Sequence, residues 1–248
     1  MNGEKVIEVS NLVKKFGSFV ANDNISFDVY RGEIFGFLGA NGAGKTTALR
    51  ILSGLSKPSS GDVKVAGYDI YRNAENVKKH IGYMCQKFSL YEDLTVAENI
   101  MLYGGIYGLA KKVIENKTDE LLESMNFTAF RKSIIGDLPL GMRQKLAFAV
   151  AILHEPEIVF LDEPTGGVDP ITRRQFWEMI YKASSDDITV FVTTHYMDEA
   201  EYCDRVSIMS EGHIVAIDSP AGLKEKYSAS SVQDVFVKIA RPDKNKKT

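Results

Sequence analysis

The sequence is poor in the features that mark disulfide-stabilised or nucleic-acid-binding proteins. It has only two cysteines among 248 residues, Cys85 and Cys203, which lie far apart and in no metal-like spacing. This usage predicts reduced thiols in a cytosolic environment rather than a disulfide framework. The formal net charge is −3 at pH 7, so no overall basic field favours nucleic acid. We therefore expect no nucleic-acid partner.

Long apolar stretches are missing as well. The longest uninterrupted one, residues 146–153, has eight residues, whereas about 20 are needed to cross a bilayer. The first residues lead into a strand-like segment at 6–9 without the pattern of a signal peptide. These absences predict a chain that does not span a membrane by itself. With 44% hydrophobic residues, the composition is that of a globular protein with a full core.

What the sequence does contain is a glycine-rich loop of the form G-x-x-x-x-G-K-[ST], the phosphate-binding loop of P-loop NTPases. The loop comprises Gly39, Ala40, Asn41, Gly42, Ala43, Gly44, Lys45, Thr46 and Thr47. Glycines let successive N–H groups point at an anion, and the start of a helix adds the positive end of its dipole. Lys45 can reach the β- and γ-phosphates, and Thr46 can place its hydroxyl on Mg²⁺. A glycine-rich turn without nucleotide is the alternative interpretation.

The pattern around this loop predicts an α/β fold. Continuous apolar segments at 33–38, 157–163 and 188–193 are typical of strands in a central parallel sheet, and a further strand at 81–86 ends in Gln86. Turns are expected at 22–24 and 30–32. A helix after the loop is predicted from apolar residues that share one face, namely Ala48, Leu49, Ile51, Leu52 and Leu55.

Polar side chains stand at the ends of two of these strands. Asp162 lies at the carboxyl end of the strand 157–163, where ligands bind in α/β sheets, and its carboxylate suits Mg²⁺. Glu163 could deprotonate a water, a role worth about 10²–10⁴ in rate. His195 follows the strand 188–193. Taken singly, each of these residues has another interpretation. The two acids could be solvated and the histidine could be structural. Gln86 could be a surface residue, and Phe16 could be part of the core.

Between these strands the pattern is mostly helical. Thr95 and Glu98 have the spacing of a capping box, and a helix is expected at 142–153. We therefore expect a helical subdomain at 89–154, inserted into a core made of 4–88 and 155–223. Asp169 and Pro170 suit the start of another helix. A C-terminal helix is expected at 224–240, opened near Ser231, and a disordered polar tail at 241–248.

This ordered set of motifs resembles the ATP-binding subunit of an ABC transporter over residues 4–240. The set comprises Phe16, the loop 39–47, Gln86, the segment 138–144, the strand 158–163, Val168, Asp169 and His195. The resemblance implies a single ABC ATPase domain. Its fold would be a P-loop NTPase (RecA-like) core with a mostly parallel sheet flanked by helices, an N-terminal antiparallel β subdomain and the inserted α-helical subdomain. Segments 89–99 and 231–236 are similar to the ABC-2 type exporters of bacteria and archaea, several of which carry drug or sodium efflux.

The resemblance also implies ligands and roles. It implies ATP and Mg²⁺, with Phe16 stacking on adenine, Lys45, Thr46 and the rest of the loop 39–47 on the phosphates, and Thr46, Gln86 and Asp162 at the metal. Glu163 would be the catalytic base and His195 a contact to the γ-phosphate, while Gln86 would also reach the attacking water. Leu138, Pro139, Leu140, Gly141 and Asp169 would act in trans, on ATP held by a partner subunit.

The partners implied are a second ATP-binding subunit, identical or diverged, and an ABC-2 type permease. Membrane association is expected only through that permease, at the cytoplasmic face of a bacterial or archaeal cell membrane. The chain departs from the family at the signature, where the common L-S-G-G-Q is replaced by L-P-L-G-M at 138–142. Pro139 removes a hydroxyl and a backbone donor. A regulatory, weakly hydrolysing subunit is therefore an alternative, and a soluble ABC protein of translation or DNA repair is a third.

Overall fold

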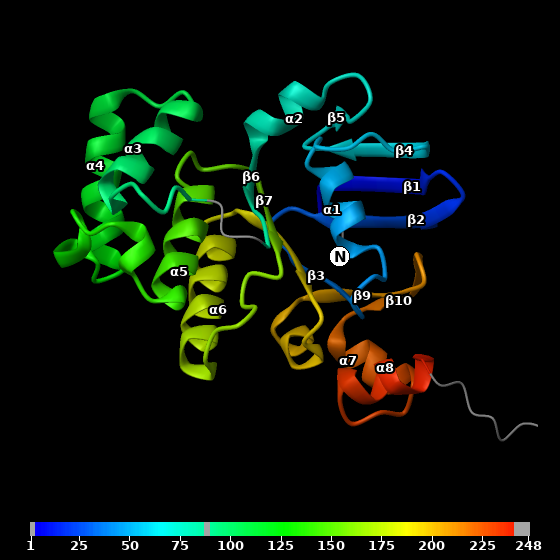
Figure 1. The fold of residues 1–248 in the computed structure, drawn as a ribbon. Helices are drawn as coiled ribbons and strands as arrows, with labels where there is room; N and C mark the ends of the chain where they lie inside the picture. Colours follow the sequence, from blue (N-terminus) through cyan, green and yellow to red (C-terminus); the bar gives the residue numbers. More distant parts are fainter. Residues whose placement is uncertain (1–2, 87–89, 241–248) are drawn as a thin grey trace, which may run out of the picture.

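Two β-sheets form the frame of the protein (Figure 1). The computed structural model describes residues 3–86 and 90–240. An antiparallel sheet has the order β2-β1-β4-β5, with β1 at Lys5–Phe16, β2 at Phe19–Tyr30, β4 at Ser60–Val65 and β5 at Tyr68–Asp69. A second sheet has the order β10-β9-β3-β8-β7-β6. Its strands are β3 (Ile34–Gly39), β6 (Ile81–Met84), β7 (Ile158–Asp162), β8 (Thr189–Thr194), β9 (Arg205–Ser210) and β10 (His213–Asp218).

The centre of the second sheet is parallel and fully buried. Every residue of β3, β7 and β8 is buried, as their continuous apolar sequences predict. Asp162 pairs with Thr193 across β7 and β8, and Leu38 pairs with Thr194 across β3 and β8. The three strands therefore end together at one edge, where the loop 39–47, Glu163 and His195 follow them.

Aromatic side chains join the two sheets. Phe27 of β2 stacks on Phe35 of β3 with ring centroids 5.7 Å apart and lies 5.4 Å from Phe37. Phe191 of β8 completes the cluster at 5.5 Å from Phe35 and 5.3 Å from Phe37. All but Phe27 are completely buried. This cluster fixes the antiparallel sheet against the strand that carries the phosphate loop.

The helices surround the second sheet. They are α1 (Lys45–Leu52), α2 (Ala74–His80), α3 (Val96–Ile106), α4 (Lys111–Ser124), α5 (Leu140–Ala151), α6 (Pro170–Ser185), α7 (Pro220–Lys226) and α8 (Val232–Ala240). In Figure 1, α3, α4 and α5 lie together on the opposite side of the molecule from the antiparallel sheet. The capping box of Thr95 and Glu98 at the start of α3 is confirmed. The division of the chain at 88/89 and 154/155 stays a prediction.

Helix α5 is held against the edge strand β6 at its far end. A side chain on Gly82 would place its Cβ 2.1 Å from the carbonyl oxygen of Ala151, so only glycine permits this approach. Next to it, Nε2 of His154 lies 3.1 Å from the carbonyl oxygen of Ile81. The end of α5 and the strand that leads to Gln86 are thus in direct backbone contact.

Three local predictions are wrong. Residues 22–24 are not a turn but lie inside β2, where register shifts accommodate Asn24 at a φ of 53°. Helix α1 ends at Leu52, and Leu55 is 55% exposed because Gly54, at a φ of 72°, turns the chain away. The predicted helix at 224–240 is divided, since α7 ends at Lys226 and α8 begins at Val232, with Ser228 at a φ of 50° between them.

Two further expectations concern the chain's ends and the membrane. The tail predicted at 241–248 lies outside the described residues. Within residues 3–86 and 90–240, no helix combines the length and the apolar character that crossing a bilayer requires.

Candidate nucleotide-binding site

The phosphate loop connects β3 to α1, as the sequence predicts. Gly42 and Gly44 have φ values of 82° and 105°, which L-residues rarely adopt. Gly44 stands directly before the first residue of α1, so the loop delivers its backbone N–H groups to the positive end of a helix. Gly39 is required for another reason, because a Cβ there would lie 2.7 Å from the carbonyl oxygen of Met209.

The phosphate loop is also shaped by a segment of β2, a contact that sequence reasoning missed. Asn22 of β2 is fully buried, and its Nδ2 donates a hydrogen bond of 3.1 Å to the carbonyl oxygen of Gly44. The carbonyl oxygen of the preceding residue, Ala21, would lie only 2.3 Å from a Cβ on Gly44. The antiparallel sheet therefore presses on the phosphate loop from one side. No local pattern around residue 22 signals this contact.

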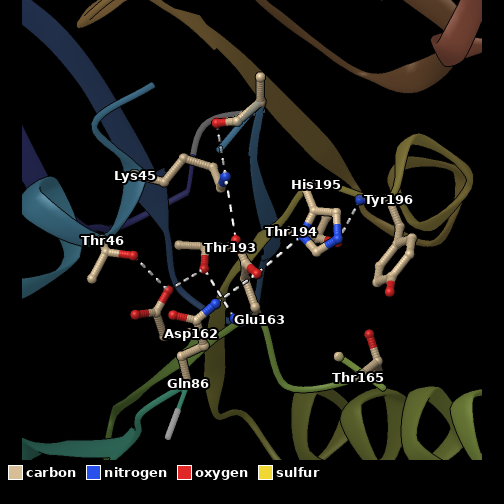
Figure 2. A network of polar contacts seen from close by, with 12 residues as sticks. Lys45, Thr46, Gln86, Asp162, Glu163, Thr165, Thr193, Thr194, His195 and Tyr196 are labelled. Carbon is tan, nitrogen blue, oxygen red and sulfur yellow. Dashed lines mark hydrogen bonds and ion pairs between the residues drawn. The ribbon is translucent and has the colours of Figure 1, made fainter. Parts of the chain in front are cut away.

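Lys45 is 4% exposed and turned back over the loop (Figure 2). Its Nζ donates to the carbonyl oxygens of Gly39 at 2.8 Å and Ala40 at 3.3 Å. It also lies 3.4 Å from Oε1 of Glu163. The ammonium group is thus held between the loop and the carboxylate that follows β7.

Asp162 is the last residue of β7 and is 2% exposed. Its Oδ1 accepts hydrogen bonds from the hydroxyl of Thr193 at 2.7 Å and from that of Thr46 at 3.2 Å. Burial raises the pKa of this carboxyl group, and the two hydroxyl donors oppose that rise. The parallel register of β7 and β8 brings Thr193 beside Asp162, which fixes the carboxyl group toward the start of α1.

Glu163 receives three nitrogen contacts from three separate elements. Beside Nζ of Lys45, Nε2 of Gln86 donates to its Oε2 at 3.0 Å, and Nδ1 of His195 lies 3.0 Å from the same oxygen. Figure 2 shows these groups converging on the carboxylate. Glu163 has a φ of 50°, a strained value held by hydrogen bonds from its N–H to both the carbonyl oxygen and the hydroxyl of Thr193. The predicted residues Lys45, Gln86, Glu163 and His195 are therefore brought together.

The signature segment and the loop that ends at Asp169 form a neighbouring region. Pro139 is the N-cap of α5 without a side-chain cap, and Asp169 caps α6 by accepting from the N–H groups of Ile171 and Thr172, each at 3.0 Å. Gly141 lies against α6, since a Cβ there would be 2.4 Å from Cγ2 of Thr172.

A small cavity of about 120 Å³ connects this region to Glu163. It is lined by Gln86, Leu140, Gln144, Glu163 and Gly166, among others. Gln144 also donates to the carbonyl oxygen of Gly166 at 3.0 Å, which ties α5 to the segment that follows Glu163. Leu138, the first residue of the signature segment, is buried. Phe16 lies elsewhere, 55% exposed at the end of β1, with Nζ of Lys14 4.9 Å from its ring centroid.

The oxygen groups at the end of β7 fit a magnesium ion. Asp162 offers a buried carboxylate, and the hydroxyl of Thr46 is already within 3.2 Å of it. Mg²⁺ prefers such oxygen ligands and is often held by one or two carboxylates together with substrate phosphates. Among the described residues there is no cluster of three or more metal-binding acids, histidines or cysteines.

The sequence pattern of the family described as ABC transporter matches residues 22–166. This chain belongs to the ABC transporter family. The matched range includes the phosphate loop, Gln86, the signature segment, Asp162 and Glu163. The family resemblance inferred from the motifs is confirmed.

Several known ABC proteins are similar over most of the chain. The probable multidrug ABC transporter ATP-binding protein YbhF of Escherichia coli (strain K12) is 47% identical over 222 residues, which are 90% of this chain and 38% of that protein. The chain thus spans about two fifths of the length of this relative. The linearmycin resistance ATP-binding protein LnrL of Bacillus subtilis (strain 168) is 35% identical over 94% of this chain and 75% of that protein.

The fold is shared with solved ABC structures. A structure described as the ATP-binding subunit of an ABC transporter superimposes with a TM-score of 0.86 at 27% identity, covering 95% of this chain and 99% of that one. The predicted P-loop NTPase fold, with an antiparallel N-terminal sheet and a mostly parallel sheet flanked by helices, is confirmed. The chain belongs to a family whose solved members include the ATP-binding subunit of an ABC transporter.

Proposed function

We propose that this chain binds ATP at the loop 39–47 and hydrolyses it to drive export through a separate membrane protein of the ABC-2 type. The observation that carries the proposal is the carboxylate of Glu163, which lies within 3.0–3.4 Å of Gln86, His195 and Lys45, beside the phosphate loop. A base, a cation and two further nitrogen groups are thus assembled at one point, as hydrolysis of the phosphoanhydride bond to the γ-phosphate of ATP requires.

Each of these residues has a defined task in the proposed reaction. The N–H groups of the loop and Lys45 bind the phosphates, and the helix dipole of α1 adds to their field. Glu163 orients a water and accepts its proton, while Gln86 and His195 hold the carboxylate from two sides. His195 donates to Glu163 when its Nδ1 carries a proton. A phosphate oxygen is an acceptor too, so Nε2 can bond to it only when that nitrogen also carries a proton. Phe16 is proposed to stack on the adenine ring.

Magnesium is the proposed cofactor, held by Thr46 and Asp162 with Gln86 nearby. When bound, the ion neutralises charge on the phosphates. The hydrogen bonds of Thr193 and Thr46 keep Asp162 turned toward the phosphate loop, so the carboxylate needs no rearrangement to meet the ion. The raised pKa of Asp162 reflects burial that a cation would offset.

The proposed partners complete the site and receive its energy. A second ATP-binding subunit, identical or diverged, would present its own segment 138–141 and Asp169 to the ATP bound here. A separate ABC-2 type permease would dock beside Gln86 and the helices α3 to α5, and would hold the chain at the cytoplasmic face of a bacterial or archaeal cell membrane. The likeness to proteins named for multidrug transport and linearmycin resistance supports an export role.

The variant Glu163→Gln tests the proposal. Gln keeps the size of the side chain and still accepts from Gln86, but it cannot take a proton from water. We expect ATP turnover by the purified complex to fall by about 10²–10⁴, with ATP binding retained. Glu178→Gln on the exposed face of α6 is the matched control, since Glu178 is solvent-exposed and forms an ion pair with Arg174. Unchanged turnover in Glu163→Gln would show that Glu163 is not the base.

A second candidate function rests on the signature segment. Because Pro139 gives α5 no side-chain cap and Leu140 is 38% exposed, the chain could instead be a regulatory subunit that binds ATP and hydrolyses it weakly. Under this alternative, the double variant Pro139→Ser with Leu140→Gly should raise ATPase activity sharply. An unchanged rate in a folded double variant would count against it.

A further inference from the structure

A buried carboxyl group lies close to the site but takes no part in the steps above. Glu199 belongs to the short helix Met197–Tyr202 that follows His195, and it is fully buried. Its Oε1 accepts a hydrogen bond of 2.5 Å from the hydroxyl of Thr165, which is 1% exposed. Its Oε2 is buried without a hydrogen-bond partner among the described residues. Burying a carboxyl group costs free energy, so this position calls for an explanation.

The partners of Glu199 come from the segment that follows Glu163. Thr165 is two residues beyond Glu163, in the loop that ends at Asp169. The second partner is Arg173, whose Nε lies 3.6 Å from Oε1 of Glu199. Arg173 stands in the first turn of α6, and its backbone N–H donates to the carbonyl oxygen of Asp169 at 2.9 Å. Glu199 therefore joins the segment after His195 to Thr165 and to the first turn of α6.

Arg173 connects this cluster to His195. Its guanidinium carbon lies 4.3 Å from the ring centroid of Tyr196, a distance at which a cation is attracted to the ring face. The ring of Tyr196 in turn lies 4.2 Å from that of His195, with 35° between the ring planes. In Figure 2, Tyr196 lies beside His195 on the side away from Glu163. One face of the imidazole is thus supported while its Nδ1 meets the carboxylate at 3.0 Å.

We propose that Glu199 and Arg173 are positioning residues that hold Tyr196 against the ring of His195 and so aim Nδ1 at Glu163. Arg173 needs Glu199 and Asp198 to keep its guanidinium over Tyr196, since Nη1 also lies 3.4 Å from the carboxylate of Asp198. The same Glu199 fixes Thr165, so the orientation of His195 and the path of the loop from Glu163 to Asp169 are set by one buried group. The inference rests on the proposed function only where it gives His195 a role in hydrolysis.

The first test monitors the environment of the His195 side chain by NMR and does not depend on ATP hydrolysis. The full chain has four histidines, so ¹³C-labelled histidine gives few side-chain NMR signals, and His195→Ala identifies the one of interest. We expect Arg173→Met and Glu199→Gln to move the signal of His195. The matched control is Arg174→Met, which removes the neighbouring arginine on the exposed face of α6, where it pairs with Glu178 at 3.5 Å. This control should leave the signal in place.

The second test reads catalysis in the purified complex. Arg173→Met should lower kcat roughly tenfold with little change in KM for ATP, because a small misplacement of a catalytic group slows the chemical step. Tyr196→Phe keeps the ring face and should retain the wild-type kcat, whereas Tyr196→Leu removes it and should share the loss. Because Tyr196 is half-buried, comparing Tyr196→Phe with Tyr196→Leu tests the positioning of His195 even where Glu199→Gln does not fold.

The outcomes are separable from those of the proposed function. An unmoved His195 signal in folded Arg173→Met would overturn the inference, as would equal kcat values for Tyr196→Phe and Tyr196→Leu. A wild-type complex without ATPase activity would refute the proposed function, and the NMR comparison of Arg173→Met with Arg174→Met would still decide the positioning role.

Discussion

The two positive-φ glycines of the phosphate loop allow a matched experiment on what shapes the loop. Gly42 and Gly44 have φ values of 82° and 105°, so alanine is strained at both. They differ in their surroundings. A Cβ on Gly42 would meet nothing within 4 Å, whereas a Cβ on Gly44 would lie 2.3 Å from the carbonyl oxygen of Ala21 and 2.7 Å from Nδ2 of Asn22. The difference between Gly42→Ala and Gly44→Ala therefore isolates the contact with the antiparallel sheet.

The structure sets the expected loss in the free energy of unfolding for each variant. Gly42→Ala should cost about 1–2 kcal/mol in the free energy of unfolding, the usual penalty of a left-handed L-residue. For Gly44→Ala the backbone of Ala21 must also retreat by about 0.7 Å to reach the shortest tolerated contact of 3.0 Å. That movement stretches the hydrogen bond from Asn22 to Gly44 beyond bonding distance, which adds about 1 kcal/mol. The total for Gly44→Ala should then be about 2–3 kcal/mol.

Thermal unfolding without nucleotide measures both variants directly. At about 2–4 °C per kcal/mol for a chain of this size, Gly42→Ala should lower Tm by about 2–8 °C and Gly44→Ala by about 4–12 °C. Titration with a fluorescent ATP analogue should show a greater loss of affinity for Gly44→Ala. Equal Tm losses for the two variants would refute the idea that the antiparallel sheet constrains the loop.

Two further predictions concern stability. Because burial raises the pKa of Asp162 above its ordinary 3.8, the folded protein binds this proton more tightly than the unfolded chain, and wild-type stability declines as pH rises from 3.8 through the raised pKa. Asp162→Asn should therefore have a higher Tm than the wild type near neutral pH, with a gain that shrinks toward acid pH. A lower Tm for this variant at neutral pH would contradict the reasoning. Thr95→Ala removes the hydroxyl that accepts from the N–H of Glu98, and should cost about 1 kcal/mol. Its control is Ser124→Ala, whose hydroxyl bonds only within the end of α4, and an equal Tm for the two would count against the cap.

The parts of the fold that could be predicted are those that a short stretch of sequence determines by its own residue pattern. The strands β3, β7 and β8 are continuous apolar segments, because strands covered on both faces leave no room for polar alternation. The end of each such strand is also predictable, and it is there that Lys45, Glu163 and His195 meet. The phosphate loop is a motif whose glycines have a direct backbone reason.

What could not be predicted depends on contacts between distant segments. Asn22 has the local pattern of a turn residue, yet it is buried inside β2, where its side-chain amide donates to the carbonyl oxygen of Gly44, 22 residues away. Leu55 fits the helical period, but the chain leaves the helix first at Ser53. The cluster of Thr165, Arg173 and Glu199 has no spacing that would reveal it, since its members meet only after α6 and β8 have folded between them.

The close backbone contact between Gly82 and Ala151 fixes the C-terminal end of α5 against β6, while its N-terminal end carries the signature segment. The helix runs for 12 residues from Leu140 to Ala151, a length of about 18 Å. A tilt of about 10° around the pinned end would carry Leu140 sideways by about 3 Å, while the strand that leads to Gln86 stayed in place. A modest push on this helix would thus shift the signature segment relative to β6, and the hydrogen bond from Gln144 to Gly166 would pass that movement to the segment that follows Glu163.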